Sequence, residues 1–199
     1  MWLGKRIFDL FFAVLGLIAL APVFAIIAIW IKKDSEGPIF FRQERVGLGG
    51  HLFRIHKFRT MRMANQGLLI TVGGDPRITR SGNFLRKYKL DELAQLIDVL
   101  KGDMSFVGPR PEVPLYVAAY PEGVKQKALS VRPGITDWAS LEFKDENDIL
   151  RDSKDPEKDY IEKILPVKLK YHLKYVESAS FPGDVKVILL TLKAIFFRG

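Results

Sequence analysis

The chain contains no cysteine and only three histidines among its 199 residues. The absence of thiols excludes disulfide bonds and thiolate metal sites, and it fits a reducing compartment. His51, His56 and His172 lack the close spacing of metal ligands, so we expect them to be ordinary surface or core side chains. Internal repeats are also absent, and the length is that of one folded domain plus a membrane element.

Several binding signatures are missing as well. The sequence has no helix–turn–helix, zinc-finger or RNA-recognition pattern, and its glycines form neither a GxGxxG nor a Walker loop. The formal net charge is nevertheless +8. Nucleic acid, an anionic membrane surface and a phosphorylated substrate could each account for this charge. We expect the membrane surface first, then a phosphorylated substrate, and no nucleic acid.

A long uncharged apolar run, Leu10–Ile31, is the most prominent feature that is present. At about 1.5 Å per residue, a helix of this run is roughly 33 Å long, enough to cross a bilayer. Pro22 near its middle removes a backbone donor and bends or breaks a helix. Basic residues flank both ends: Lys5, Arg6, Lys32 and Lys33. Because basic flanks favour the cytoplasmic side, we expect a proline-kinked re-entrant helix; the alternative is a bent transmembrane anchor.

The rest of the chain predicts a mainly α fold with a short β-hairpin. Two extended segments, Ile39–Val46 and Leu52–Met61, flank a glycine-rich turn. Helices are predicted at Asn83–Lys87, Leu90–Leu100, Val113–Tyr120 and Pro166–Val176. Gly183–Phe197 is amphipathic, which predicts a helix in the membrane interface or a core helix. We therefore divide the chain into a re-entrant membrane helix, residues 1–33, and a cytoplasmic domain with interfacial helices, residues 34–199, which together form a monotopic membrane protein.

Two short patterns carry chemistry-bearing side chains. Asp91 and Glu92 lie in the first turn of a predicted helix, where acids are favoured by the helix dipole, so spacing alone indicates simple helix-start chemistry. Arg110 is held between Pro109 and Pro111 on a stiff segment. Such an arginine suits phosphate binding, or it is the solvent-facing arginine of a rigid connector.

The segment Asp75–Pro111, DPRITRSGNFLRKYKLDELAQLIDVLKGDMSFVGPRP, closely resembles the bacterial sugar transferase family. These are monotopic phosphoglycosyl transferases that start glycoconjugate synthesis on polyprenol phosphate. Lys57–Met61 (KFRTM) is similar to the family's KF[RK]TM motif, and Arg132–Thr136 (RPGIT) to its RPGIT motif. The basic-flanked run with its internal proline resembles the family's re-entrant helix. The resemblance extends from the N-terminus to about residue 140 and is vague after it.

This resemblance implies an enzyme that transfers a sugar-1-phosphate from a UDP-sugar to a polyprenyl phosphate such as undecaprenyl phosphate, with release of UMP. It implies that Asp91 is the nucleophile of a covalent phosphosugar–aspartate intermediate and that Glu92 assists the acceptor step. Mg²⁺, held by Asp91, is the implied cofactor. The implied location is the cytoplasmic face of the bacterial inner membrane, and a homodimer stays open. The alternatives are a membrane-bound metal-dependent phosphohydrolase and a non-enzymatic scaffold for anionic membranes.

Basic side chains are expected around the substrate. The attacking carboxylate and the diphosphate are both negative, so positive side chains are needed to reduce the repulsion between them. The predicted substrate-binding set is Lys57, Arg59, Arg77, Arg86, Arg110 and Arg132. Structural roles are expected for Pro22, Pro109 and Pro111. One departure from the family is prominent: after RPGIT the family usually has glycine, whereas this chain has Asp137. Because aspartate adds charge and bulk, we expect altered sugar recognition there.

Overall fold

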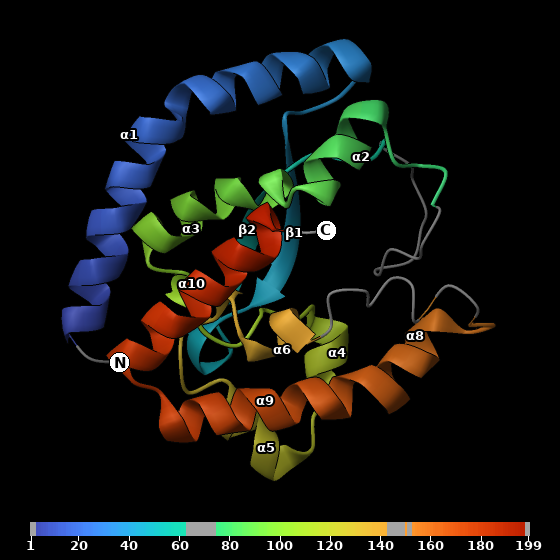
Figure 1. Ribbon diagram of the computed structural model, residues 1–199. Coiled ribbons are helices and arrows are strands. Elements are labelled where there is room, and N and C mark those ends of the chain that lie inside the picture. The colour runs from blue at the N-terminus through green and yellow to red at the C-terminus, as the bar shows by residue number, and fades with distance from the viewer. Residues whose placement is uncertain (1–2, 63–74, 143–149, 151–152, 198–199) are drawn as a thin grey trace.

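A computed structural model describes residues 3–62, 75–142, 150 and 153–197. Its first half contains α1 (Leu3–Asp34), β1 (Phe40–Val46), η1 (Leu48–Gly50), β2 (Leu52–Phe58), α2 (Arg80–Lys87), η2 (Leu90–Gln95), α3 (Leu96–Lys101) and β3 (Ser105–Val107). The second half contains α4 (Pro114–Ala118), α5 (Glu122–Ala128), β4 (Gly134–Thr136), α6 (Trp138–Glu142), α8 (Pro156–Asp159), η3 (Tyr160–Ile164), α9 (Leu165–Ser178) and α10 (Phe181–Phe196). The prediction of a mainly helical chain with a short hairpin is confirmed (Figure 1).

The apolar run lies within α1, which is one helix with Pro22 inside it. Figure 1 shows α1 bent rather than straight, so that it wraps over α3 and α2. Ala13, Ile27 and Ile31 are buried against the rest of the molecule. Most of the other large apolar side chains of α1 are exposed, among them Leu3, Ile7, Phe11, Leu15, Ile18, Ile26 and Ile29. By length and composition this helix could cross a membrane, and its exposed apolar face needs an apolar environment.

The predicted hairpin is confirmed. Strands β1 and β2 pair antiparallel from Phe40 opposite Phe58 to Val46 opposite Leu52. Between them Gly49 and Gly50 have φ values of 63° and 88°, a backbone conformation that glycine adopts without strain. The side chains that β2 turns inward meet α1 and α3 in one apolar cluster: Ala13, Phe53, Ile55, Val99 and Met104. The hairpin therefore packs directly against α1.

The helix predicted at Leu90–Leu100 is divided in two. Lys89 adopts a left-handed conformation (φ 56°, ψ 20°), which is uncommon outside glycine. The chain therefore turns sharply after α2, and the next six residues form the 3₁₀ helix η2 before α3 begins at Leu96. The 3₁₀ helix η2 places Leu90 and Ala94 in one apolar cluster, whereas α3 places Val99 in another, a division that helical periodicity alone does not reveal.

A second, parallel strand pair was not predicted. Strands β3 and β4 pair Ser105 with Gly134 and Val107 with Thr136. The backbone segments next to the two strands approach each other so closely that a Cβ on Gly108 would lie 2.4 Å from the Arg132 carbonyl oxygen. Only glycine fits such a crossing. The pair joins the two stiff proline-containing segments of the sequence at one edge of the domain.

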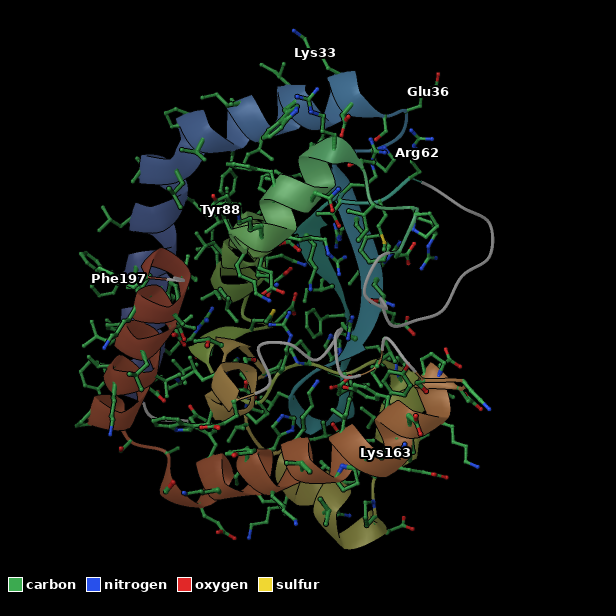
Figure 2. The ribbon with its side chains drawn as sticks, turned by 45° about the vertical axis from the view of Figure 1, so that its right-hand side comes forward. Lys33, Glu36, Arg62, Tyr88, Lys163 and Phe197 are labelled. Carbon is green, nitrogen blue, oxygen red and sulfur yellow. The ribbon has the colours of Figure 1, made fainter. Side chains whose placement is uncertain are left out.

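The second half of the chain packs around α9. An apolar cluster joins α4, α5, η3 and α9, and it includes Val117, Ala128, Tyr160 and Leu169. Helix α10 then returns to α1: the rings of Phe8 and Phe181 lie 5.3 Å apart, and Lys5 forms an ion pair with Asp184. Val187 of α10 is fully buried, as expected of a core helix, whereas Leu189 and Leu192 are exposed; placement of this helix in the membrane interface stays a prediction. Figure 2 shows Phe197 just past its end and Lys33 extending away from α1.

Candidate active site

Asp91 and Glu92 lie in the first turn of η2, which packs directly against β2. The left-handed Lys89 that precedes them sets their direction, and the Glu92 amide donates to the Lys89 carbonyl oxygen at 3.3 Å. Non-glycine residues in this conformation are often found at functional sites. The Asp91 side chain is only slightly exposed, so the two adjacent carboxylates share a largely water-excluded environment.

Glu92 is surrounded by positive charge. Lys57 Nζ donates to Oε1 at 3.0 Å, Arg110 Nη1 donates to Oε2 at 3.0 Å, and Arg110 Nη2 also contacts Oε1. Burial alone would raise the pKa of Glu92, but Arg110 and then Lys57 outweigh it and hold the pKa well below its usual range. Glu92 is therefore an ionised carboxylate that holds two cations in place.

Asp91 has the opposite environment. Its Oδ1 is buried and has no hydrogen-bond partner among the described residues. Burial and the negative charge of Glu92 raise its pKa, while Lys57, Arg86 and Lys89 oppose that rise. A buried carboxylate oxygen without a donor costs free energy in the absence of a ligand. Such an oxygen can attack an electrophile or bind a cation.

Lys57 connects the two carboxylates. It comes from β2, lies about one-fifth exposed, and has a pKa lowered by burial and by Arg110, while Glu92 and Asp91 act against that lowering. The lysine thus faces both members of the pair. Lysine and arginine together can cancel the charge of an incoming phosphate, since each donates hydrogen bonds to phosphate oxygens.

Arg110 is positioned by its backbone. Pro109 and Pro111 restrict the chain on either side of it, and Nη1 also donates to the Ile135 carbonyl oxygen at 3.3 Å. The Arg110 amide donates to Asp137 Oδ2 at 3.3 Å. As predicted, a stiff segment positions the guanidinium of Arg110. The partner of that guanidinium is the Glu92 carboxylate.

The other predicted arginines have different surroundings. Arg59 is buried and donates to the Ser35, Glu36 and Pro38 carbonyl oxygens, so it closes the C-terminal end of α1. Arg77 forms a bidentate pair with Asp75. These contacts hold neither Arg59 nor Arg77 beside Asp91 and Glu92.

Arg132 and Arg86 lie on different sides of η2 and α3. Arg132 Nε donates to the Gly102 carbonyl oxygen at 2.7 Å, where α3 ends. Burial lowers the pKa of Arg6, and the positive charge of Arg132 lowers it further. Arg86 is on α2, and its charge acts on Asp91. Of the six predicted basic residues, the structure therefore gathers Lys57, Arg86 and Arg110 around the pair. Substrate contacts by all six stay predictions.

A second buried charged cluster was not predicted. Glu112 Oε1 accepts from the Tyr160 hydroxyl at 2.5 Å, the Tyr160 hydroxyl accepts from Lys168 at 3.0 Å, and Lys168 lies 3.7 Å from Glu112. We call these three residues the Glu112 network. Burial would raise the pKa of Glu112, but Lys168 and Arg45 outweigh it and lower the pKa. No local pattern could have predicted this network, because its members are far apart in the chain.

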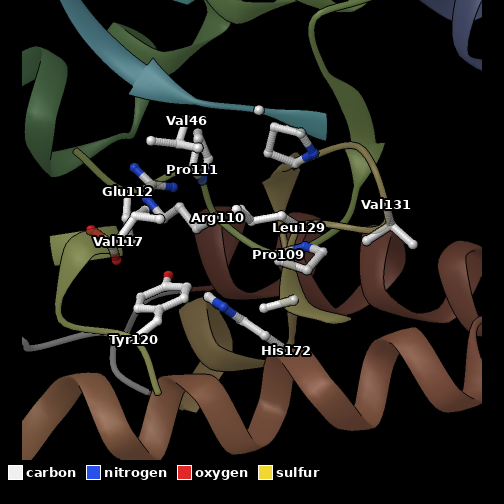
Figure 3. A pocket seen from close by; sticks show the side chains of 13 residues that line it. Val46, Pro109, Arg110, Pro111, Glu112, Val117, Tyr120, Leu129, Val131 and His172 are labelled. Carbon is white, nitrogen blue, oxygen red and sulfur yellow. The ribbon is translucent and has the colours of Figure 1, made fainter. Parts of the chain in front are cut away.

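Between the pair and the Glu112 network lies a small cavity of about 20 Å³, room for about one water molecule. Pro109, Arg110, Glu112, Tyr120 and His172 are among the residues that line it. Figure 3 shows His172 reaching from α9 toward the segment that holds Pro109 and Arg110. The cavity is too small for a nucleotide sugar. It lies instead where Arg110 faces residues from the second half of the domain, among them His172 of α9.

The carboxylate pair is also compatible with a magnesium ion. Among the described residues, no three His, Asp or Glu side chains gather as a metal site. Mg²⁺, however, is usually held by one or two carboxylates together with substrate phosphates and water. Asp91 Oδ1, the buried acceptor without a partner, is an oxygen of the kind that Mg²⁺ binds. The residues present therefore fit the predicted ion.

Comparison with known proteins places these features in a family. A sequence model described as bacterial sugar transferase matches residues 1–198. The chain is 37% identical to UDP-glucose:undecaprenyl-phosphate glucose-1-phosphate transferase of Escherichia coli (strain K12), over 94% of this chain and 39% of the relative. A protein of the same name from Xanthomonas campestris pv. campestris is 39% identical, over 94% of this chain and 38% of the relative.

A further relative has a different sugar in its name. It is UDP-N-acetylgalactosamine-undecaprenyl-phosphate N-acetylgalactosaminephosphotransferase of Aeromonas hydrophila, 34% identical over 96% of this chain and 43% of the relative. The chain thus spans about two fifths of the length of these curated relatives. The shared portion contains the carboxylate pair, Lys57 and Arg110.

Proposed function

The chain belongs to the bacterial sugar transferase family, as its motifs predicted, and from this premise we propose that it transfers a sugar-1-phosphate from a UDP-sugar to undecaprenyl phosphate. The names of the relatives support the donor and acceptor classes. The observation that carries the proposal is the pairing of Asp91, which has an unpartnered buried oxygen, with Glu92, which holds Lys57 and Arg110 beside it.

In the first step, an Asp91 oxygen attacks the phosphorus that bears the sugar. The bond from that phosphorus to the bridging oxygen breaks, and UMP leaves with the bridging oxygen and the electron pair. An acyl phosphate joins Asp91 to the sugar phosphate. Aspartate is a competent nucleophile at phosphorus, as in aspartyl-phosphate enzymes. Lys57 and Arg110 face the site of attack and reduce the repulsion between carboxylate and diphosphate.

In the second step, a phosphate oxygen of undecaprenyl phosphate attacks the same phosphorus. The acyl phosphate bond breaks, Asp91 regains its carboxylate, and the product is a sugar diphosphate on the lipid. Glu92 is ionised and fixed by its two cations, so its expected role is to orient Lys57 and Arg110 toward the acceptor phosphate. One site thereby accepts a soluble and a lipid substrate in turn.

Mg²⁺ is part of the proposal, with Asp91 as its protein ligand. When bound, the ion neutralises charge on the diphosphate. The residues of the chain do the remaining work: Asp91 supplies the nucleophilic oxygen, Glu92 orients the cations, and Arg110 and Lys57 bind phosphate oxygens. Removal of divalent ions with EDTA should stop turnover, and added Mg²⁺ should restore it.

The membrane arrangement is the third part of the proposal. Helix α1 exposes apolar side chains, and the hairpin and η2 pack beneath it. We expect α1 to enter the cytoplasmic leaflet of the inner membrane and to return to the same face, with Pro22 at its bend. The carboxylate pair would then lie at the depth of the lipid phosphates, where a polyprenyl phosphate presents its head group.

One assay separates this function from its alternatives. Purified protein in detergent micelles receives Mg²⁺, a panel of UDP-sugars and undecaprenyl phosphate, and UMP release is measured. Transferase activity requires that UMP and the lipid-linked product form together. UMP formed without lipid acceptor, together with free sugar phosphate, indicates a phosphohydrolase, and no turnover with any sugar favours a membrane scaffold.

Topology is tested by labelling in this cysteine-free chain. Single cysteines at Gly4 and Lys33, which are exposed at the two ends of α1, should both react with a membrane-impermeant maleimide from the cytoplasmic side. A cysteine at Ile18 in the exposed apolar face should be protected by lipid. Labelling of Gly4→Cys and Lys33→Cys from opposite sides would show a transmembrane helix instead.

A further inference from the structure

Two buried titratable side chains lie behind the site and have no part in the reaction as proposed. Asp137 and His172 are each about 2% exposed. They come from different halves of the domain, since Asp137 follows β4 and His172 is on α9. Asp137 Oδ2 lies 3.3 Å from His172 Nε2. A buried carboxylate is stable only where donors or a positive charge compensate it.

The strand pairing brings Asp137 to Arg110. Because Val107 of β3 is opposite Thr136 of β4, the residues that follow the two parallel strands leave the pair at the same edge. The Gly108 amide donates to the Thr136 carbonyl oxygen at 3.1 Å. One step further on, the Arg110 amide donates to Asp137 Oδ2 at 3.3 Å. The hydrogen bond that the Asp137 carboxylate accepts thus extends the pairing of β3 and β4 into the proline-flanked segment.

The second oxygen of Asp137 is also occupied. Oδ1 accepts from the Ser140 amide at 2.7 Å, which closes the first turn of α6. Burial would raise the pKa of Asp137, but His172 and Ser140 outweigh it and lower the pKa. The remaining groups that face the Asp137–His172 pair electrostatically are Glu112, Tyr120 and Tyr175. A carboxylate buried this completely does not touch a sugar, so direct sugar recognition by Asp137 does not fit its position.

We propose that Asp137 is a positioning residue: its carboxylate accepts from the main-chain amide of Arg110 and so holds that segment where the guanidinium meets Glu92. This inference rests on the proposed transferase function. Pro109 and Pro111 have no amide hydrogen, so the amide of Arg110 is the single backbone donor between them. A glycine at position 137 would remove the acceptor for that donor. It would also remove the carboxylate beside His172.

Kinetics in two backgrounds test the proposal. Asp137→Asn keeps the size of the side chain but replaces one oxygen with an amide nitrogen, so it cannot accept from both Ser140 and Arg110. In an otherwise wild-type chain we expect kcat/KM for the UDP-sugar to fall about tenfold. In an Arg110→Gln background the same substitution should change kcat/KM by less than about twofold. An equal loss in both backgrounds would mean a merely structural role and would overturn the proposal, as would no loss in the wild-type background.

Amide exchange provides a second measurement that does not depend on activity. Within Gly108–Pro111 the only amides are those of Gly108 and Arg110, and deuterium uptake there should rise in Asp137→Asn. Asp155→Asn is the matched control, because Asp155 Oδ1 also accepts from the amide three residues later but caps the N-terminus of α8. It should leave both uptake and kcat/KM unchanged. If wild-type protein transfers no sugar phosphate, the proposed function fails, and exchange alone then decides: unchanged uptake in Asp137→Asn overturns the positioning contact.

Discussion

The carboxylate pair and the Glu112 network are both buried clusters of acid and base, yet they are built differently. In the Glu112 network, Glu112 Oε1, the Tyr160 hydroxyl and Lys168 contact one another, and the contacts join the segment between β3 and α4 to η3 and α9. In the pair, Glu92 is compensated while Asp91 Oδ1 is left without a donor. Buried charge alone therefore does not identify an active site. The unpartnered oxygen of Asp91 has unused chemistry beside two compensating cations, and for that reason we assign the reaction to it.

The largest expected effect is on the unpartnered oxygen. Asp91→Asn removes the proposed nucleophile but keeps the size of the side chain, and we expect sugar-phosphate transfer to fall by at least about 10³-fold. UMP release with UDP-sugar, undecaprenyl phosphate and Mg²⁺ measures this loss. Asp155→Asn, which alters the N-cap of α8, is the control and should retain activity. Near wild-type turnover of Asp91→Asn would disprove the covalent mechanism.

The Glu112 network should respond in stability rather than in chemistry. Lys168→Met removes the nearer cation of the buried Glu112 and leaves only Arg45 to offset its charge, and loss of one partner of a buried pair costs about 3 kcal/mol of unfolding free energy. The pKa of Glu112 is lowered in the fold, so the stability that its charge contributes is present above its unfolded pKa. That stability is lost as pH falls through the lowered folded pKa. The deficit of the variant should accordingly shrink in acid.

Denaturant unfolding in micelles at neutral and acidic pH measures this deficit. Lys170→Met, on the same helix at a position exposed to solvent, is the matched control and should change stability by less than about 0.5 kcal/mol. A Lys168→Met protein of unchanged stability but lost activity would reverse the comparison and place the network in the reaction.

Lys57→Met is the counterpart within the active site. Lys57 bridges toward both carboxylates, and its removal should lower kcat by about 10²-fold, the usual size for a lost phosphate-facing cation. Because Arg110 still compensates Glu92, stability should change little. Steady-state kinetics measure the loss of kcat, and thermal unfolding measures the change in stability. Substantial unfolding of Lys57→Met, with normal activity of the folded fraction, would contradict the functional assignment.

The smallest effect concerns the stability cost of the active site itself. The pKa of Asp91 is raised by burial and by Glu92, so its contribution to stability is present at low pH and is lost as pH rises through the raised folded pKa. Asn has no such loss. We therefore expect Asp91→Asn to be more stable than wild type by about 1 kcal/mol at neutral pH, with the gain fading on acidification. A variant that is equally stable at all pH values would show that Asp91 is not strained by burial.

The sequence predicted what depends on local patterning. Two extended segments around a glycine-rich turn predicted the hairpin. Of the site residues that the motifs predicted, the structure brings Lys57, Glu92 and Arg110 together. Pairings between distant segments were not predictable in the same way. The three-residue strands β3 and β4 are too short for a periodic signal. They form because Gly108 and Gly134 permit a close crossing.

The basic residues illustrate the same division. Charge and motif position could not distinguish Arg110, which faces Glu92, from Arg59, which closes the end of α1, or from Arg132, which binds the end of α3. Each lies in a similar basic, proline-rich or aromatic context in the sequence. Only the fold decides whether a guanidinium meets a carboxylate or a backbone carbonyl. Asp137 was noticed because it departs from the family, but its partner His172 had no sequence signal.

The ion pair between Lys5 and Asp184 joins residues 179 positions apart, and this separation sets an order of events during synthesis. Helix α1 leaves the ribosome before α10, which is the last described element to be made. The docking of the domain onto α1 is therefore completed only when α10 arrives. Until then Lys5 lacks its partner Asp184, so a ribosome-stalled chain that ends before residue 181 should hold a folded hairpin against an α1 that is not yet fixed in place.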